Sequence, residues 1–552
     1  MDNQIWSWFT YQPDKPLIFT QLYFWVFFTI VLAIFSVIYP RKTLRNAYLF
    51  LISLFFYYKT SGLFVLILIF STVSDFLIGK KIYGSERILT KKLWLSLSVF
   101  LNLFVLFYFK YAYFFTDTFN SMAGTNYEVY NHLAYWSNSF FDTSFRADKI
   151  LLPVGISFFT FQTISYAVDV YKGLIKPVRH ITDFGFYVSF FPQLVAGPIV
   201  RASEFIPQLY KPYTLTRMEF GTAIFWILNG LLKKMFLADY LAVNFIDRVF
   251  SNPGSFSGFE NMMALFGYSL QVYADFSGYT DIAIGVALLL GFRLPVNFNS
   301  PYKATSVGDF WRRWHISLST WLRDYLYIPM GGNRHGSLFS YIMVLVVLLF
   351  VALLAERLSI FVIGLGVIAG VALLCRYLPT FKKWIDTNIN LMLTMTLGGL
   401  WHGASWNMVF WGALNGVGLI IFKQWKRFSP WRDHSRWYFR AWSIALTLIF
   451  ITFTRAWFRG ESFDAAHLML HRIAYAFNAA IIPEVLYNYR HVFIFLIGGY
   501  IIHWLPSSFK LWYRETFARQ HIGVQVSAAV ITVFLIYQVL SAELQPFIYF
   551  VF

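Results

Sequence analysis

Long apolar segments recur along this chain, and they limit its possible folds more than any other feature. Three clear examples run from Leu17 to Ile38, from Gly62 to Gly79 and from Leu93 to Phe115. A helix needs roughly 20 mainly apolar residues to cross a bilayer, and inside lipid only helices and closed barrels satisfy the backbone. The alternating segments that a membrane barrel requires do not occur in the sequence. The pattern therefore predicts an all-α polytopic membrane protein with about ten to fourteen transmembrane helices.

Charge and composition agree with this class and exclude others. Charged residues make up 13% of the chain, against about 25% in soluble proteins. The formal net charge is +18, but Lys and Arg lie in short loops beside apolar segments, a pattern typical of membrane topology and not of nucleic-acid binding. The single cysteine, Cys375, rules out an internal disulfide, and its apolar surroundings predict a buried, inert thiol. The first residues, up to Pro16, lack the features of a cleaved signal peptide, so we expect an uncleaved first helix.

The loops predict how the chain alternates across the membrane. Basic loops at 41–45 and 80–92 are expected in the cytoplasm, and the segment 117–149, which leans to acid, is expected outside. The apolar stretch 184–196 is too short for a confident crossing, and helix-breaking residues follow it at 197 and 198. A re-entrant or irregular segment is therefore expected there.

An apolar helical hairpin is predicted in the second half of the chain. Its helices would run from Tyr341 to Leu354 and from Ile360 to Leu378, separated by Glu356 and Arg357. Further crossings are expected up to the C-terminal end, and no soluble domain or sequence repeat is evident. One membrane domain is therefore expected over residues 1–552.

Two carboxylates, Asp275 and Asp281, lie in the apolar segment from Ala264 to Phe292. Each would cost roughly 2.5–3.5 kcal/mol at the centre of a membrane helix, so both need partners or a cavity. Their spacing of six residues keeps them off a common helix face, which argues against a paired acid and base. They either have a structural, hydrogen-bonded role or line a reaction channel.

The stretch from Asp309 to Arg334 contains the first notable histidine, His315. Helical spacing predicts one face with Trp311, His315, Leu318 and Leu322, and a neighbouring face with Arg312, Ser319 and Arg323. Such a helix would lie at the cytoplasmic surface or dip in from it, with Arg312, Arg313 and Arg323 available to an anionic ligand. An interfacial helix whose arginines meet lipid phosphates would explain the same pattern.

The second histidine, His402, lies between Trp401 and Gly403 in the segment from Leu391 to Leu414, which has no other ionisable side chain. An ionisable residue within a membrane helix is by default a functional hypothesis. A neutral imidazole that hydrogen-bonds across helices is the structural alternative. Gly398, Gly399 and Gly403 would allow close approach by a helix or by a thin substrate. Imidazole can accept a proton from a hydroxyl near neutral pH, as acyl transfer requires.

Motifs for other chemistries are missing. The sequence has no phosphate-binding P-loop, no dinucleotide fingerprint after a strand, no CxxC and no HExxH. The spacing of His315 and His402 gives no pattern of metal ligands, so no metal site and no bound cofactor are expected.

Five blocks together resemble the membrane-bound O-acyltransferase superfamily and, within it, the bacterial branch of alginate O-acetyltransferases. They are PVGISFFTFQTISYAVDVYKG (153–173), FPQLVAGPIVR (191–201), DFSGYTDIAIG (275–285), DFWRRWHISLSTWLRDYLYIPMGGNR (309–334) and GGLWHGASWNMVFWGALNG (398–416). The resemblance covers roughly residues 40–425. It implies a ring of helices, with re-entrant or interfacial helices, around a thin central region and a tunnel open to both faces.

The resemblance also implies an activity. His402 corresponds to the membrane-buried histidine taken as catalytic, and His315 to the second histidine of the family. Acetyl-CoA, or another acyl thioester, would be the cytoplasmic donor, and the residues expected to bind it or to line the tunnel are Arg312, Arg313, Arg323, Trp311, Asn333 and Trp401. The protein would lie in a bacterial cytoplasmic (inner) membrane among its lipids. A periplasmic or surface partner with a serine-esterase-like (SGNH) fold would pass the acetyl group to a polysaccharide, which would be alginate, as in alginate biosynthesis, another exopolysaccharide or peptidoglycan.

Departures from the family pattern keep alternatives open. The apolar hairpin at about 341–378 is extra, and the helices of 426–552 match only loosely, so the acceptor and the partner are not defined. D-alanyl or longer acyl transfer to teichoic acid, lipid or protein is one alternative. A transporter or flippase, or a scaffold in a polysaccharide export complex, is another.

Overall fold

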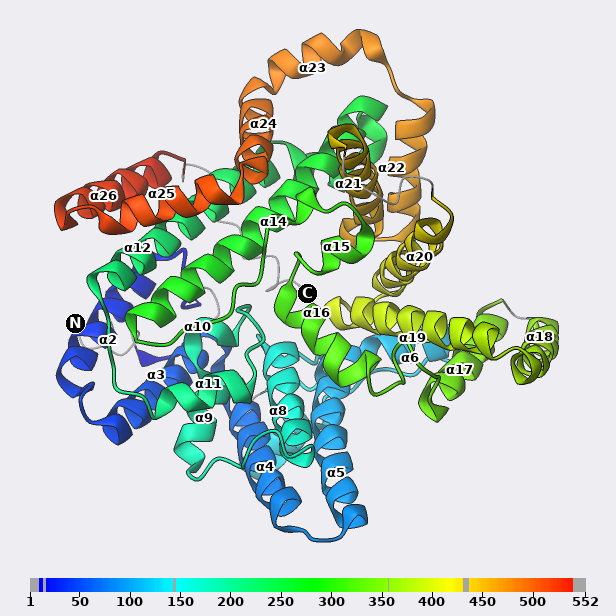
Figure 1. Cartoon of the computed structure of the whole chain (residues 1–552), viewed down its shortest axis with the longest axis horizontal. Helices are drawn as coiled ribbons and strands as arrows, with labels where there is room; N and C mark the ends of the chain where they lie inside the picture. Colours follow the sequence, from blue (N-terminus) through cyan, green and yellow to red (C-terminus); the bar gives the residue numbers. More distant parts are fainter. Residues whose placement is uncertain (1–8, 13–15, 142–144, 356, 430–435, 540–552) are drawn as a thin grey trace. The chain divides into compact units, whose positions relative to one another are not determined.

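Within the residues that the structure describes, every regular element is a helix, which confirms the predicted all-α class. The structure is a computed structural model that describes residues 9–12, 16–141, 145–355, 357–429 and 436–539 (Figure 1). The residue ranges of most helices are given where each one is described. The other helices are α2 (Leu22–Ile38), α3 (Lys42–Ser61), η1 (Gly62–Phe64), α4 (Val65–Gly84), α5 (Ile88–Leu106), α6 (Ala112–Ala123), α7 (His132–Phe141), α11 (Ala202–Leu209), η4 (Ala242–Ile246), α13 (Asp247–Ser251), η5 (Pro253–Ser255), α22 (Phe463–Tyr475) and η8 (Ala479–Ile481).

Five helical runs in the described residues are long and apolar enough to cross a membrane. They are Lys42–Gly84, Ile88–Ala123, Arg217–Ser251, Leu358–Tyr377 and Trp437–Arg459. Two helix pairs pass the same test together but are bent, by 92° between α23 (Ile482–Asn488) and α24 (Arg490–Trp504) and by 114° between α25 (Ser507–Arg519) and α26 (Ile522–Val539). Counting these pairs gives up to seven spans. The chain is thus a multi-pass membrane protein, while ten to fourteen crossings stay a prediction.

The chain divides into two compact units. Unit 1 comprises Met1–Asn102, Val154–Ser319 and Asp433–Phe552, and unit 2 comprises Leu103–Pro153 and Thr320–Arg432. His315 belongs to unit 1 and His402 to unit 2. A single domain over residues 1–552 stays a prediction.

Two long helices pack backbone to backbone in unit 1. These helices are α12 (Arg217–Leu232) and α14 (Gly258–Leu289). A Cβ added at Gly230 of α12 would meet the carbonyl of Gly278 of α14, and a Cβ added at Gly285 of α14 would meet the carbonyl of Ala223 of α12. Small residues of this kind let membrane helices approach closely. The contact therefore depends on glycine at several positions.

Buried ion pairs join the same region to α14. The π-helix η3 (Lys233–Asp239) continues α12, and its Lys233 Nζ lies 2.6 Å from Asp281 Oδ2. The next residue, Lys234, has its Nζ 2.5 Å from Asp275 Oδ1 and 2.9 Å from Asp239 Oδ1. Both predicted carboxylates thus have the structural role that was one of the two alternatives.

Short helices replace a crossing around residues 181–196, as predicted. α9 (Ile181–Ser189) and α10 (Phe191–Leu194) are separated at Phe190, and almost every side chain in them is buried. α9 lies beside α8 (Ile156–Tyr171), whose side chains are also nearly all buried, and α10 packs on α14 and α3. Irregular backbone is tolerated in an apolar setting when protein covers it.

Unit 2 is built on α19 (Pro379–His402) and α20 (Trp406–Phe428), which pack closely at two facing glycines. A Cβ at Gly399 would meet the carbonyl of Met408 and the backbone of Gly412. A neighbouring helix, not an open space, therefore occupies the room that Gly399 leaves.

The predicted hairpin is confirmed as α17 (Leu338–Leu354) and α18 (Leu358–Tyr377), which contact each other beside α19 (Figure 1). Its expected separator Glu356 lies outside the described residues. The prediction of a buried thiol was wrong, because Cys375 is only half-buried and α18 has no buried residue. An apolar sequence does not distinguish a helix that faces lipid from one inside a protein core.

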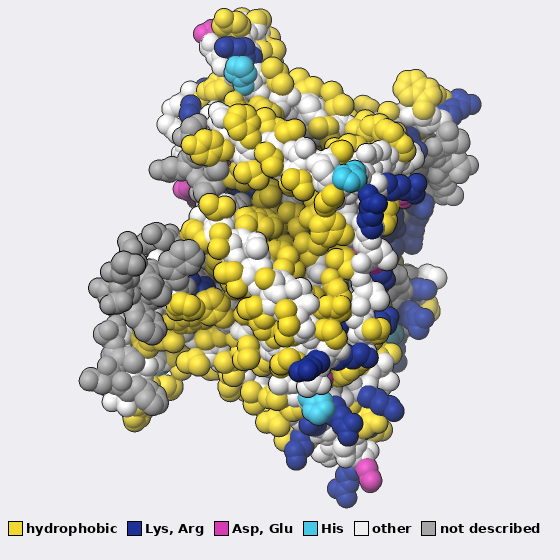
Figure 2. Space-filling model, turned by 90° about the vertical axis from the view of Figure 1, so that its left-hand side faces the viewer, with side chains coloured by type: hydrophobic (Ala, Val, Ile, Leu, Met, Phe, Trp, Pro, Cys, Tyr) yellow, Lys and Arg dark blue, Asp and Glu magenta, His cyan; other side chains and the backbone are white. Residues whose placement is uncertain are grey.

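Apolar side chains cover much of the molecular surface. Figure 2 shows a face on which hydrophobic side chains predominate, with Lys and Arg gathered toward one margin. On α2, for example, Leu22 and Val37 are 77% and 78% exposed. Such a surface is suited to lipid contact.

Candidate active site

His315 lies in a tight turn and not inside a helix. α15 (Val307–Trp311) ends before it, α16 (Ile316–Leu322) begins after it, and His315 itself has φ +43°. The predicted single helix, with Trp311 and His315 on one face and Arg312 and Arg323 on its neighbour, was therefore wrong. A left-handed conformation is uncommon for a residue with a side chain and marks a place where the surrounding structure imposes the backbone.

The imidazole of His315 is fully buried and is oriented by one amide. The side-chain oxygen of Asn297 accepts hydrogen bonds from Ser317 N (3.0 Å) and Ser317 Oγ (2.9 Å), and His315 Nδ1 lies 3.2 Å from it. Because a backbone N–H can only donate, this atom is an acceptor, and Nδ1 must carry the imidazole proton. The lone pair of the neutral ring is then on Nε2.

The surroundings keep this ring neutral and connect it to a second sequence block. His315 lies outside the helices long enough to span a membrane, and burial lowers its pKa to about 3. The ring of Phe276 on α14 meets it edge-on at 4.6 Å. The N–H of Ile199, within the FPQLVAGPIVR block, donates to Ser317 Oγ at 3.0 Å.

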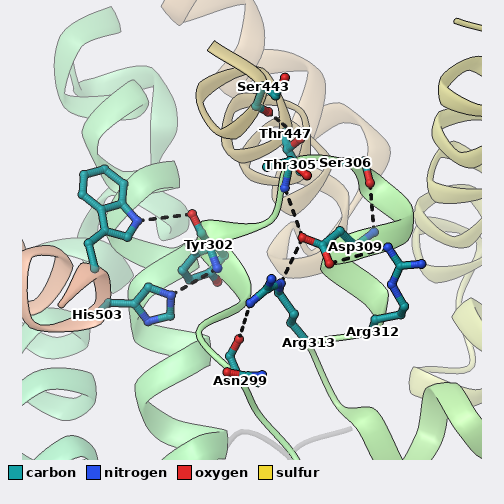
Figure 3. A network of polar contacts seen from close by, with 11 residues as sticks. Asn299, Tyr302, Thr305, Ser306, Asp309, Arg312, Arg313, Ser443, Thr447 and His503 are labelled. Atoms are coloured by element: carbon teal, nitrogen blue, oxygen red, sulfur yellow. Dashed lines mark hydrogen bonds and ion pairs between the residues drawn. The ribbon is translucent and has the colours of Figure 1, made fainter. Parts of the chain in front are cut away.

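Asp309 joins the two arginines that precede His315. Arg313 Nε donates to Asp309 at 3.0 Å and its Nη1 donates to the carbonyl of Asn299 at 3.3 Å, whereas Arg312 Nη2 lies 3.6 Å from Asp309 (Figure 3). Arg312 is 77% exposed and Arg313 is 29% exposed. Arg313 thus stabilises the loop through its contacts with Asp309 and Asn299. Arg312 is more exposed and is therefore the more accessible of the two to a ligand.

The same loop is anchored to the C-terminal helices of unit 1. The N–H of Tyr302, in the short helix η6 (Pro301–Lys303), donates to His503 Nε2 on α24 at 3.1 Å (Figure 3). The indole of Trp504 donates to the carbonyl of Tyr302 at 3.2 Å. The half-buried Trp311 lies at the end of α15 in this region.

Residues 320–334 of the first histidine stretch belong to unit 2. Arg323 opens the π-helix η7 (Arg323–Tyr327) and is bound to Asp324 at 2.6 Å. Asn333 is exposed in the turn that follows, and its side-chain oxygen accepts from the Tyr327 hydroxyl at 2.8 Å. Gly331 and Gly332 have φ +109° and +55° there, and Asn390 of α19 donates to the carbonyl of Gly332 at 3.0 Å.

His402 is the last residue of α19, and Gly403 continues in an extended conformation. The interpretation of His402 as a residue inside a membrane helix is thereby corrected, because the helix ends at His402 and α20 begins at Trp406. The side chain is 3% exposed. Trp401 and Trp411 meet its ring nearly perpendicularly, with ring centres 5.0 and 5.3 Å away.

Two side chains of the first unit 2 segment cap the C-terminal end of α19. Lys110, in the π-helix η2 (Phe107–Tyr111), donates to the carbonyl of Trp401 at 2.6 Å and lies 3.3 Å from the carbonyl of His402. The neighbouring Tyr111 donates to the carbonyl of Leu400 at 3.0 Å. The last carbonyls of a helix have no partner within the helix, and a cation there also complements the helix dipole.

Two residues that contact the histidine segments, Lys110 and Asn297, were not predicted from the sequence. Lys110 could have been found, since it is the only charged residue between Leu93 and Phe115. A lone charge in a membrane helix is the same indication that singled out His402. Nothing in the pattern around Asn297 points to a partner of His315, because that contact forms across a loop.

The predicted site residues thus form two groups. Trp311, Arg312, Arg313 and His315 lie together in unit 1. Arg323, Asn333, Trp401 and His402 lie in unit 2. In the described part of the chain no cluster of three or more His, Cys, Asp or Glu could hold a metal ion.

Comparison with known proteins agrees with these blocks. A model of the membrane-bound O-acyltransferase family (MBOAT) matches residues 178–363, a range that contains His315 and ends before His402. A probable alginate O-acetylase AlgI of Azotobacter vinelandii is 38% identical over 353 residues, covering 63% of this chain and 58% of the relative. A peptidoglycan O-acetyltransferase of Helicobacter pylori is 33% identical over 445 residues, 76% of this chain and 72% of the relative. A teichoic acid D-alanyltransferase of Bacillus subtilis is 27% identical over 326 residues, 57% of this chain and 70% of the relative.

The share of each relative that this chain covers determines what can be concluded from the matches. The chain spans 58% of the length of the Azotobacter relative, less than two thirds of that protein. It spans 72% of the Helicobacter relative, at an identity well above what chance gives over such a length. The chain belongs to the membrane-bound O-acyltransferase family.

Proposed function

We propose that the protein is an O-acyltransferase that moves an acetyl group from a cytoplasmic thioester donor, such as acetyl-CoA, across a bacterial inner membrane for O-acetylation of an extracytoplasmic polysaccharide. The observation that carries this proposal is His402, a buried imidazole at the end of a helix in a chain of this family. The alginate and peptidoglycan O-acetylating relatives favour acetyl as the group and a polysaccharide as the final acceptor.

In the proposed step, His402 acts as general base. It accepts the proton of an incoming hydroxyl while the hydroxyl oxygen forms a bond to the acyl carbon. The bond from that carbon to the thioester sulfur breaks, and the thiolate takes the proton from the His402 imidazolium and leaves as a thiol, which returns His402 to its neutral form. His315, with its proton on Nδ1 and its lone pair on Nε2, orients or polarises groups on the donor side.

The arginines have the donor as their proposed ligand. Arg312 and Arg323 are more than half exposed, at 77% and 58%, and each already contacts one carboxylate. Phosphates of a donor would compete with Asp309 and Asp324 for these groups. Trp311, Arg313, Asn333 and Trp401 complete the proposed donor-binding or tunnel-lining set. An extracytoplasmic partner of the serine-esterase (SGNH) type would receive the acetyl group.

D-alanyl transfer to teichoic acid is the second candidate, favoured by the Bacillus relative. It needs the same base and differs in the donor and the acceptor. A transporter is less well supported, because the carboxylates Asp275 and Asp281 that suggested an ion path are bound to Lys234 and Lys233.

The proposal is tested by the acetyl-ester content of surface polysaccharides in a strain that lacks this protein. Loss of esters, restored by the unsubstituted chain but not by the His402→Ala variant at equal abundance, is expected. Unchanged esters in the deletion strain would contradict acetylation, and loss of D-alanyl esters instead would establish the second candidate.

A further inference from the structure

Lys110 is a basic residue of unit 2 in a stretch that carries no other charge from Leu93 to Phe115. It lies in Ile88–Ala123, one of the runs that can cross a membrane. A charge in such a place is normally tied to a partner or to function. None of the sequence blocks of the family resemblance includes this position.

The contacts of Lys110 converge on one helix end. Its ammonium is 2.6 Å from the carbonyl of Trp401 and 3.3 Å from that of His402, and it lies 5.8 Å from the centre of the Trp401 ring. Tyr111 binds the preceding carbonyl, that of Leu400. Lys110 and Tyr111, which are successive residues, therefore bind three successive carbonyls at the end of α19.

Both donors lie in a π-helical turn. η2 (Phe107–Tyr111) interrupts the α-helical repeat between α5 and α6, with α-helix on both sides. Such single-turn bulges within α-helices occur frequently at functional sites. Here consecutive side chains, Lys110 and Tyr111, both donate to the same helix end.

We infer that Lys110 is a positioning residue for His402, which fixes the last turn of α19 and thereby the imidazole that this turn carries. The inference rests on the proposed function, because it assigns a purpose to the position of His402. Gly403, which follows at once, leaves the α-helical conformation, so the helix itself does not continue past the ring to hold it. The ammonium restrains this helix end through the two carbonyls and offsets its partial negative charge.

Positioning matters because general-base catalysis needs the ring nitrogen within hydrogen-bond reach of the hydroxyl. A displacement of about 1 Å can reduce a rate about 100-fold. Loss of Lys110 should thus reduce turnover while leaving donor affinity nearly unchanged, since its hydrogen bonds to Trp401 and His402 end on backbone carbonyls of α19.

The test compares Lys110→Met, Lys110→Arg and Tyr111→Phe in the full chain. Lys59→Met is the matched control, because Lys59 in α3 of unit 1 also donates to a backbone carbonyl, that of Thr10. Labelled acetyl-CoA is the donor for inside-out membrane vesicles, and labelled ester formation gives kcat and KM. Hydrogen exchange of the segment 398–408 is measured by mass spectrometry on the same purified variants.

Lys110→Met should lower kcat about 10- to 100-fold with KM changed less than about twofold, and should speed exchange in 398–408. Lys110→Arg should restore both readings, Tyr111→Phe should have a smaller effect, and Lys59→Met should leave both unchanged. Unchanged kcat or unchanged exchange in Lys110→Met would overturn the inference. If the unsubstituted chain transfers no acetyl group, the proposed function fails separately, and the exchange of 398–408 still decides whether Lys110 holds this helix end.

Discussion

The two units hold their polar groups in apolar surroundings by different means. In unit 1 the buried lysines Lys233 and Lys234 are matched with carboxylates of α14, and His315 is oriented by an amide in a left-handed turn. In unit 2 Lys110 is matched with the carbonyls at a helix end, and His402 lies at that end. The histidine of unit 1 thus depends on backbone conformation, whereas that of unit 2 depends on a neighbouring charge.

The largest effect should come from the ring that is proposed to accept a proton. His402→Ala and His402→Gln should each reduce acetyl transfer about 10²- to 10⁴-fold, the range that a general base contributes. The measurement is ester formation from labelled acetyl-CoA at matched protein abundance, with thermal unfolding in detergent as the control. Transfer at the normal rate by either variant would remove His402 from the mechanism.

Unfolding measurements can test whether the buried lysines of unit 1 depend on their carboxylate partners, in contrast to Lys110 of unit 2, which binds backbone carbonyls. Lys233→Met leaves Asp281 as an uncompensated buried carboxylate and should lower the free energy of unfolding by about 3–5 kcal/mol. The double variant Lys233→Met/Asp281→Leu should recover most of that loss, because replacing both partners removes the unmatched charge. Denaturation midpoints measure both. Equal loss in the single and the double variant would contradict the pairing.

At His315, two substitutions can separate the effect of the left-handed backbone from the effect of losing the imidazole. Both His315→Ala and His315→Gly remove the ring and should impair transfer, but the alanine variant should be less stable than the glycine variant by about 1 kcal/mol, because φ is +43°. Comparing the unfolding midpoints of the two variants isolates the backbone from the imidazole. Greater stability of the alanine variant would argue that the turn is not strained.

The smallest effect is expected at the exposed arginine of the same loop. Arg312→Ala should change the free energy of unfolding by less than about 0.5 kcal/mol, because this side chain is 77% exposed. If Arg312 binds donor phosphates, the KM for acetyl-CoA should rise about tenfold or less. Arg313→Ala is the companion variant, and it should lower stability more because Arg313 bonds to Asp309 and Asn299. An unaltered KM in Arg312→Ala would exclude this arginine from donor binding.

Sequence reasoning reached the helical class, the broken segment around 184–196 and the hairpin, because apolar length and helix-breaking residues directly reflect the cost of burying backbone. It did not reach the turn at His315 or the helix end at His402. Helical spacing depends only on the order of the residues. It therefore does not reveal that one residue, such as His315, adopts a positive φ. The partners Asn297 and Lys110 are distant in sequence from the histidines they serve, so only the folded chain brings them into contact.

The half-buried thiol of α18 has a practical consequence. Because Cys375 is the only cysteine in the chain and α18 has no buried residue, a spin label or fluorophore can be attached at one defined place without first removing other thiols. Quenchers placed at known depths in the lipid would then report how deeply the hairpin of α17 and α18 is immersed in the native protein.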